Sequence, residues 1–160
     1  MKIRILAVGA VKEKSFIDAI KEYSKRLTSY VNLEIIEVSD EPIDKKCGKT
    51  LNQVIKEKEG NKLLKHIKEQ DYVILLDLHE SKEEDSIMFA KHLDNLMTKG
   101  KSVIDFVIGG SLGNGENIRK RANERLSLSK MTFTHQMTRL ILLEQIYRAF
   151  KINNNETYHK

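Results

Sequence analysis

The stretch Val103-Ile104-Asp105-Phe106-Val107-Ile108-Gly109-Gly110-Ser111 decides the fold class of this chain. Its first six residues are mostly apolar on both faces, which is typical of a buried parallel strand. Glycines directly after such a strand let the backbone approach a ligand closely. Ligands of open α/β sheets bind outside the carboxyl ends of the strands, so the stretch predicts a binding loop on a parallel sheet. A plain tight turn is the alternative interpretation.

Three further short apolar runs predict the other strands of this sheet: Ile3–Val8, Leu33–Val38 and Tyr72–Leu78. Amphipathic patterns between the runs predict helices over Ser15–Tyr30, Leu51–Lys68 and Ser81–Lys99. Ser15 is the expected N-cap of the first helix, and the third begins with a capping-box pattern, Ser81-Lys82-Glu83-Glu84. The segment Asp40–Lys49 is expected to be a loop. This alternation predicts an α/β fold, a parallel sheet flanked by helices, in a single domain over residues 1–160.

The positive charge of the chain is concentrated in its last third. Residues 109–160 hold nine Lys or Arg and four Asp or Glu, whereas residues 1–108 hold nineteen of each. A basic surface attracts phosphate backbones, although five excess charges do not establish nucleic-acid binding. No apolar run approaches the roughly 20 residues of a membrane span. The single cysteine, Cys47, excludes an internal disulfide and a cysteine-based zinc cluster. The composition favours a cytoplasmic protein without a membrane segment.

A second loop candidate is Leu126–Phe133, which reads Leu-Ser-Leu-Ser-Lys-Met-Thr-Phe. The alternation indicates a strand, whose C-terminal half would offer backbone N–H and C=O groups to an adenine edge. An edge strand with a turn is the alternative. Leu76 is expected near the carboxyl end of its strand. Asp77 and His79 follow it, but they make no metal site without further ligands.

The glycine run at residues 109–115 matches no standard phosphate-binding motif. A Rossmann fingerprint opens after the first strand of a fold, and a P-loop requires Gly-Lys followed by Ser or Thr. Neither condition is met here. The run therefore supports a ligand loop only in combination with other segments.

The apolar segment Leu140–Phe150 predicts the last helix. His135 and Arg139 are four residues apart and share one face of this helix, while Glu144 and Arg148 share another. Arg139 and Arg148 are half a turn out of phase, so they cannot both point into one small site of the same subunit. Apolar residues surround the helix, which in a small chain predicts a dimer interface. A structural Glu144–Arg148 ion pair is the alternative role for those two residues.

The chain resembles the ribosomal RNA large-subunit methyltransferase H family of the SPOUT superfamily over its whole length. The matching segments are Ile5-Leu6-Ala7-Val8-Gly9, Glu57-Lys58-Glu59-Gly60, Ile108-Gly109-Gly110-Ser111, Leu126–Phe133, His135, Leu143-Glu144-Gln145-Ile146-Tyr147-Arg148-Ala149 and Tyr158-His159. One departure is Thr134, where the family commonly has proline. Proline would stiffen that turn, whereas Thr134 is able to cap the following helix.

The resemblance implies a deep trefoil knot in the C-terminal part, a homodimer, and S-adenosyl-L-methionine held in the knot loops. It also implies methylation of N3 of a pseudouridine in helix 69 of the large-subunit ribosomal RNA, on the assembled ribosome, without a metal. By matching positions, the expected cofactor contacts are Leu76, Gly109, Leu128, Ser129, Lys130, Met131, Thr132 and Phe133. The residues matching those tied to the pseudouridine are Arg148, Tyr158 and His159.

The chemistry of these three side chains suggests hypotheses for their roles. His159 is the reasonable general base for the N3 proton, Arg148 binds phosphate or stabilises a developing oxyanion, and Tyr158 stacks on or hydrogen-bonds the base. The sequence leaves open which residue is the base and whether one site mixes residues of two subunits. Two rival functions are a non-catalytic RNA- or ribosome-binding module and a flavodoxin-like enzyme acting on a small nucleotide.

Overall fold

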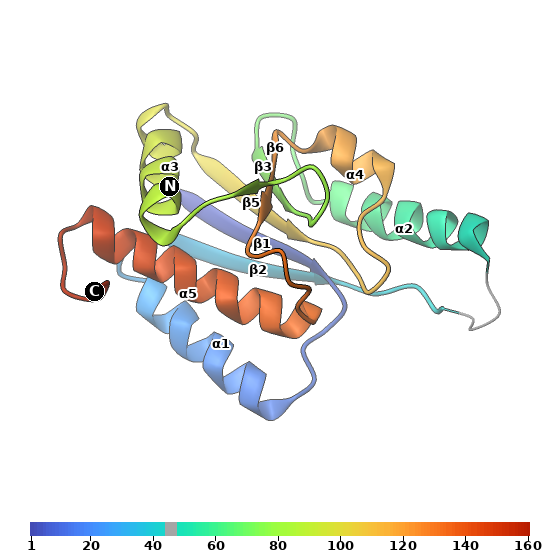
Figure 1. Ribbon diagram of the computed structural model, residues 1–160, viewed down its shortest axis with the longest axis horizontal. Coiled ribbons are helices and arrows are strands. Elements are labelled where there is room, and N and C mark those ends of the chain that lie inside the picture. The colour runs from blue at the N-terminus through green and yellow to red at the C-terminus, as the bar shows by residue number, and fades with distance from the viewer. Residues whose placement is uncertain (44–47) are drawn as a thin grey trace.

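The structure is a computed structural model, and it describes residues 1–43 and 48–160 (Figure 1). Strands and helices alternate along the described chain. The strands are β1 (Lys2–Val8), β2 (Asn32–Val38), β3 (Tyr72–Leu76), β4 (Lys82–Glu83), β5 (Val103–Ile108) and β6 (Glu124–Ser127). The helices are α1 (Lys14–Leu27), α2 (Lys49–Leu64), α3 (Ser86–Thr98), α4 (Glu116–Arg121) and α5 (His135–Asn153). Cys47 lies outside the described residues.

The six strands form one parallel sheet in the order β2-β1-β5-β3-β6-β4. The α/β fold with a parallel sheet flanked by helices is therefore confirmed. The register pairs Leu76 with Ile108 on one side and with Leu126 on the other. The carboxyl ends of β3, β5 and β6 consequently lie side by side, and the segments that follow them leave the sheet together.

Helices cover both faces of the sheet. On one face, α1, α3 and α5 pack against side chains such as Ile5, Ile74 and Phe106. On the other, α2 and α4 pack against the alternate side chains of the same strands, including Leu6 and Leu75. This alternation is what period-2 strands with two apolar faces produce. Within the described residues, no helix is long and apolar enough to cross a membrane.

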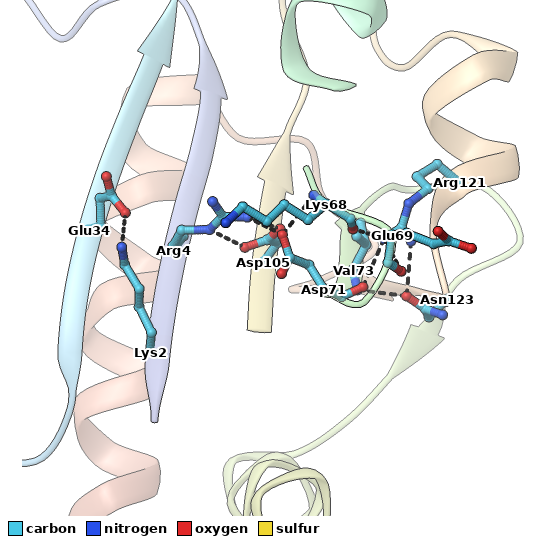
Figure 2. A network of polar contacts seen from close by, with 10 residues as sticks. All are labelled: Lys2, Arg4, Glu34, Lys68, Glu69, Asp71, Val73, Asp105, Arg121 and Asn123. Atoms are coloured by element: carbon cyan, nitrogen blue, oxygen red, sulfur yellow. Dashed lines mark hydrogen bonds and ion pairs between the residues drawn. The ribbon is translucent and has the colours of Figure 1, made fainter. Parts of the chain in front are cut away.

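A buried polar network crosses the sheet towards the amino ends of its strands (Figure 2). Arg4 on β1 donates from Nε to Asp105 Oδ1 at 2.7 Å and from Nη2 to Asp105 Oδ2 at 2.6 Å. The same Nη2 reaches Asp71 Oδ2, just before β3, at 2.6 Å. Arg121 donates to the carbonyl oxygens of Lys68 and Asp71. The network joins β1, β3 and β5 near their amino ends, whereas the loops that follow β3, β5 and β6 lie at the carboxyl ends of the strands.

Two predicted helix starts are wrong. Helix α1 begins at Lys14, one residue before the expected cap Ser15, because the Glu13 carbonyl accepts the first helical hydrogen bond, from Ile17. The capping box at Ser81 does not form, because Lys82 and Glu83 instead pair with β6 as the short strand β4. Helix α3 starts later, after Asp85, whose carboxylate accepts from the Met88 amide at 2.7 Å. The cap pattern at Ser81 fails because its residues pair with a neighbouring strand instead of starting a helix.

Two strand predictions are also too long. The predicted strand Tyr72–Leu78 ends at Leu76. The segment Leu126–Phe133 is a strand only as far as Ser127. Beyond that point side chains compete with the sheet for backbone groups: Ser127 Oγ donates to the Ser129 carbonyl at 2.6 Å, and Ser129 Oγ accepts from the Met131 amide at 3.0 Å.

Helix α5 is longer than the predicted Leu140–Phe150, since it starts directly after Thr134. The hydroxyl of Thr134 accepts from the Met137 amide at 3.3 Å, which confirms the capping role expected of threonine here. Seven of the nineteen residues of α5 are buried within the single chain, against α1, α3 and the sheet. The apolar pattern of this helix is thus largely accounted for without a second subunit, and it no longer argues for a dimer by itself.

Candidate active site

A cavity of about 780 Å³ opens at the carboxyl ends of β3, β5 and β6. Seven of the eight predicted cofactor residues line it: Leu76, Gly109, Leu128, Ser129, Met131, Thr132 and Phe133. Lys130, the eighth, is exposed and is not among the lining residues. The side-by-side strand ends bring together three segments that are separate in sequence: Leu76, the glycine loop after β5, and residues 128–133. The volume is in the range of small-molecule sites.

The glycine loop after β5 is held by an asparagine that the sequence analysis did not single out. Asn114 is buried, and its Nδ2 donates to the Leu76 carbonyl at 3.0 Å. A Cβ added to Gly109 would lie 2.3 Å from Asn114 Oδ1 and 3.1 Å from the Gly113 carbonyl oxygen. Glycine at position 109 is therefore required by the packing of its own loop.

Asp77 and Arg119 form an ion pair in the wall of the cavity, with Arg119 Nε 2.8 Å from Asp77 Oδ2. Burial raises the pKa of Asp77, but the His79 amide and the Arg119 guanidinium outweigh it and hold the pKa below the usual value. Asp77 is consequently ionised and neutralised by Arg119. Its place directly after an apolar strand was the one sequence signal for this pair, because Arg119 is forty-two residues away.

The amino end of α5 closes one side of the cavity with Thr134, His135 and Thr138. Arg139 is almost completely buried beneath it, and its Nη2 donates to the carbonyl oxygens of Val8, at 3.1 Å, and of Gly9. The predicted shared face of His135 and Arg139 is confirmed, since Nη2 also lies 3.5 Å from His135 Nδ1. The first helical residue of α5 therefore sits beside the end of β1.

Clusters suited to a metal ion are not found in the described part of the chain, where no three His, Cys, Asp or Glu side chains come together in that way. Asp77 and His79 stay close, but the nearest described cation to the carboxylate is Arg119.

A protein family described as "Predicted SPOUT methyltransferase" matches residues 1–159. The chain belongs to the SPOUT methyltransferase family. Among its relatives, proteins named "Ribosomal RNA large subunit methyltransferase H" are 52% identical in Clostridium botulinum (strain Kyoto / Type A2) and 47% identical in Desulfitobacterium hafniense (strain Y51). Each alignment covers the whole of this chain, with 100% of the first relative and 99% of the second.

A solved structure supports the fold of this SPOUT methyltransferase. It is described as a probable methylase family protein from Haemophilus influenzae Rd KW20, and it aligns with a TM-score of 0.53 over 99% of this chain and 70% of that one. At 13% sequence identity the likeness concerns the fold alone. The resemblance noted from the sequence motifs and the match to the family over residues 1–159 agree on the family.

The tail of this SPOUT methyltransferase folds back on α5 and gathers the three predicted catalytic residues. Arg148 lies with its guanidinium carbon 4.8 Å from the ring centroid of Tyr158, and its Nη1 is 3.2 Å from His159 Nδ1. Glu144 accepts from Arg148 Nη2 at 2.6 Å and from the Tyr158 hydroxyl at 3.2 Å. The Glu144–Arg148 ion pair considered from the sequence is therefore present, and it also holds the tail.

Two further contacts keep this tail in place. The ring of Tyr158 meets that of Tyr147 edge-on, with centroids 5.0 Å apart. Glu156 is paired with Lys151 and accepts from the Tyr30 hydroxyl at 2.9 Å. Burial raises the pKa of Tyr158, so its hydroxyl is protonated and available as a donor. The polar stretch before Tyr158 is thus anchored on both sides.

The cavity and this tail cluster lie at opposite ends of α5. Thr138 lines the cavity and Arg148 lies ten residues further along the helix, a separation of roughly 15 Å at 1.5 Å per residue. Figure 1 shows the same arrangement, with the C-terminus at the far end of α5 from the loops after β5 and β6. Within one chain the two groups of predicted residues do not converge.

Proposed function

We propose that this chain transfers a methyl group from S-adenosylmethionine to N3 of a pseudouridine in helix 69 of the large-subunit ribosomal RNA. Membership of the SPOUT methyltransferase family supports methyl transfer, and the names of the relatives at about half identity support the RNA substrate. The observation that carries the proposal is the gathering of seven predicted cofactor residues in one cavity. A cytoplasmic location, where ribosomes assemble, is part of the proposal.

The residues present fit the cofactor. Apolar side chains of Leu76, Leu126 and Leu128 flank the cavity. Residues 129–133 make no backbone-to-backbone hydrogen bond with any described residue. The Ser129 carbonyl and the Met131 amide pair with the Ser127 and Ser129 hydroxyls, and the other N–H and C=O groups of this segment are free to pair with the edge of an adenine. Free backbone groups beside an apolar wall suit a planar heterocycle. These residues would hold the nucleoside part, with the glycine loop opposite.

The reaction places clear demands on the remaining residues. S-adenosylmethionine, when bound, would supply a sulfonium methyl group to the N3 lone pair and would leave as the neutral thioether. The N3 proton must leave to a base, for which His159 is our candidate. Arg148 and Tyr158 position the pseudouridine by charge and by stacking or hydrogen bonding. Alignment of the two reactants supplies much of the acceleration.

We further propose that the protein works as a homodimer and that each active site takes its cavity from one subunit and its tail from the other. The separation of the two groups along α5 supports this arrangement, since residues roughly 15 Å apart cannot act on one base within a single chain. In a two-fold dimer the same contact is made twice, so two complete sites result. The trefoil knot expected from the resemblance belongs to this proposal as well.

Methyl transfer from tritiated S-adenosylmethionine to ribosomes that lack this modification tests the function. Modification confined to the pseudouridine is expected, with calorimetry reporting cofactor binding. A protein that binds ribosomes but not the cofactor would be an RNA-binding module, and one that binds only small nucleotides would be a flavodoxin-like enzyme. Either result would contradict the proposal.

Mixing two inactive variants tests the shared site. Gly109→Val damages the cavity and Arg148→Ala damages the tail. If each site combines two subunits, mixed dimers carry one intact site, and re-equilibrated mixtures should recover about a quarter of the wild-type activity. If each site belongs to one chain, the mixture stays inactive. Light scattering of the wild type should give about twice 18.5 kDa.

A further inference from the structure

The His135 side chain lies at the side of the cavity and is held there by its neighbours. It is the first residue of α5, after the cap Thr134, and it lines the cavity. Its ring packs on Gly9, where an added Cβ would lie 3.4 Å from His135 Cε1. Gly9 has a φ of +85°, a left-handed conformation that glycine adopts without strain. Backbone conformation and ring contact both favour glycine at position 9.

Arg139 determines which nitrogen of the ring carries the proton. Its Nη2 lies 3.5 Å from His135 Nδ1 and is itself held by the carbonyl oxygens of Val8 and Gly9. Both hydrogens of Nη2 go to these carbonyl oxygens, so its contact with Nδ1 is electrostatic. A positive guanidinium repels an N–H pointed at it and favours a lone pair there, so Nδ1 is the unprotonated nitrogen. The neutral ring then carries its proton on Nε2. No described residue accepts a hydrogen bond from Nε2.

The surroundings also keep the ring neutral. Burial lowers the pKa of His135, and the positive charge of Arg139 lowers it further, while Asp40 and Glu37 oppose the shift. Glu37 is itself paired with Arg139, with its Oε1 3.3 Å from Nη1. A protonated imidazole here would face the guanidinium of Arg139 across a short distance. His135 is therefore a neutral N–H donor near neutral pH.

We propose that His135 donates this Nε2–H hydrogen bond to a carbonyl oxygen of the target base, an inference that rests on the proposed function. Loss of the N3 proton leaves negative charge shared between N3 and its two neighbouring carbonyl oxygens. A neutral donor beside one oxygen stabilises this charge and transfers no proton itself. The proton goes to the separate general base. A neutral histidine at a helix amino end is suited to this electrophilic role.

Nitrogen-15 NMR of the imidazole tests the state of the ring without any reaction. In the wild-type protein at neutral pH, His135 is expected to be the neutral Nε2–H tautomer, with a protonation midpoint below the usual value for histidine. A cationic ring at neutral pH, or an Nδ1–H tautomer, would overturn the proposal. This result does not depend on the identity of the RNA substrate.

Two variants of similar size test the hydrogen bond. His135→Gln keeps an N–H donor near the position of Nε2, and His135→Leu removes it. The Leu variant should lower kcat about 100-fold, with the KM for ribosomes and the Kd for S-adenosylmethionine changed less than about threefold. The Gln variant should retain most of kcat. Thermal melting of both variants checks that the fold is kept.

Other outcomes separate this inference from the function on which it rests. Full kcat in His135→Leu would overturn the proposal, as would a loss confined to cofactor affinity, which would place His135 against the cofactor. A wild-type protein that methylates no ribosomes would overturn the proposed function and the target of the hydrogen bond together. The NMR measurement would still decide whether the ring is a neutral donor.

Discussion

Arg4 and Asp105 face each other across β1 and β5 and are joined by two charge-assisted hydrogen bonds, in a part of the sheet that excludes water (Figure 2). Asp105 is fully buried and Arg4 is 8% exposed. The hydrogen bonds that Arg4 donates to Asp105 raise the pKa of Arg4, so the guanidinium stays charged despite its burial. The pair is a rigid link between neighbouring strands, at the edge of the sheet away from the cavity.

Replacing Asp105 by Asn should lower the free energy of unfolding by about 3 kcal/mol, because it leaves the buried guanidinium of Arg4 with one carboxylate in place of two. Urea unfolding at matched protein concentration measures this. Glu34→Gln is the control, since Glu34 on β2 pairs with Lys2 on β1 through partly exposed side chains and its replacement should cost less than about 1 kcal/mol. Equal losses in the two variants would contradict the prediction.

The contacts of His92 should make the folded protein less stable at alkaline pH than near neutrality. Its Nε2 is 2.8 Å from Glu124 and its Nδ1 is 3.0 Å from Glu84, and these contacts, with Glu124 the stronger, raise the pKa of His92 to about 9. Because the folded value exceeds that of an unfolded histidine, the stabilisation is complete below about pH 6.5 and is lost as pH rises through about 9.

Melting temperatures of His92→Gln across this range check the sign. The difference from the wild type should be largest in mildly acidic buffer and should shrink at a pH above about 9. His66→Gln, at an exposed histidine, is the control and should show no such trend. A difference for His92→Gln that is independent of pH would mean that His92 is not charged in the folded protein.

Gly109→Val should weaken S-adenosylmethionine binding by roughly tenfold or more, because its Cβ would displace Asn114 and the loop that Asn114 ties to Leu76. Calorimetry measures the affinity. Gly48→Ala is the matched control, since a Cβ at Gly48 meets nothing within 4 Å. Normal affinity in Gly109→Val would place the cofactor elsewhere.

Deleting Tyr158–Lys160 should leave folding and cofactor binding nearly intact and should strongly reduce methylation. The deletion removes two of the proposed substrate residues but keeps the Glu144–Arg148 pair and the contacts of Glu156. Tritium transfer to ribosomes and calorimetry separate the two effects, and deletion of Lys160 alone is the control. Full activity would remove Tyr158 and His159 from the mechanism and leave Arg148 as the remaining candidate.

The parallel sheet was predictable because its strands are apolar on both faces, a signal that each short run carries by itself. Strand β4 was not, because Lys82 and Glu83 are polar and are fixed only by pairing with Leu126 and Ser127. A local capping pattern at Ser81 pointed elsewhere. The start of the third helix was therefore predicted wrongly, because it depends on a strand pairing with residues distant in sequence.

The candidate site divides in the same way. Motif resemblance singled out the loop residues, and seven of them share one cavity. Asn114 and Arg119 were missed, because their roles depend on the contacts with Leu76 and Asp77. The shared helix face of His135 and Arg139 was predictable from their spacing. The contact of His135 with Gly9 was not, because no local pattern connects residues so far apart in sequence.

The absence of backbone hydrogen bonds at residues 129–133 has a consequence for the way this protein responds to deuterated water. The Met131 amide donates to the Ser129 hydroxyl, but the other amides of this segment should exchange rapidly, while those of the neighbouring strand β6 are protected. A cofactor that pairs with this loop should slow its exchange and leave the amino edge of the sheet unchanged. The binding site is therefore open to mapping on the unaltered chain, peptide by peptide.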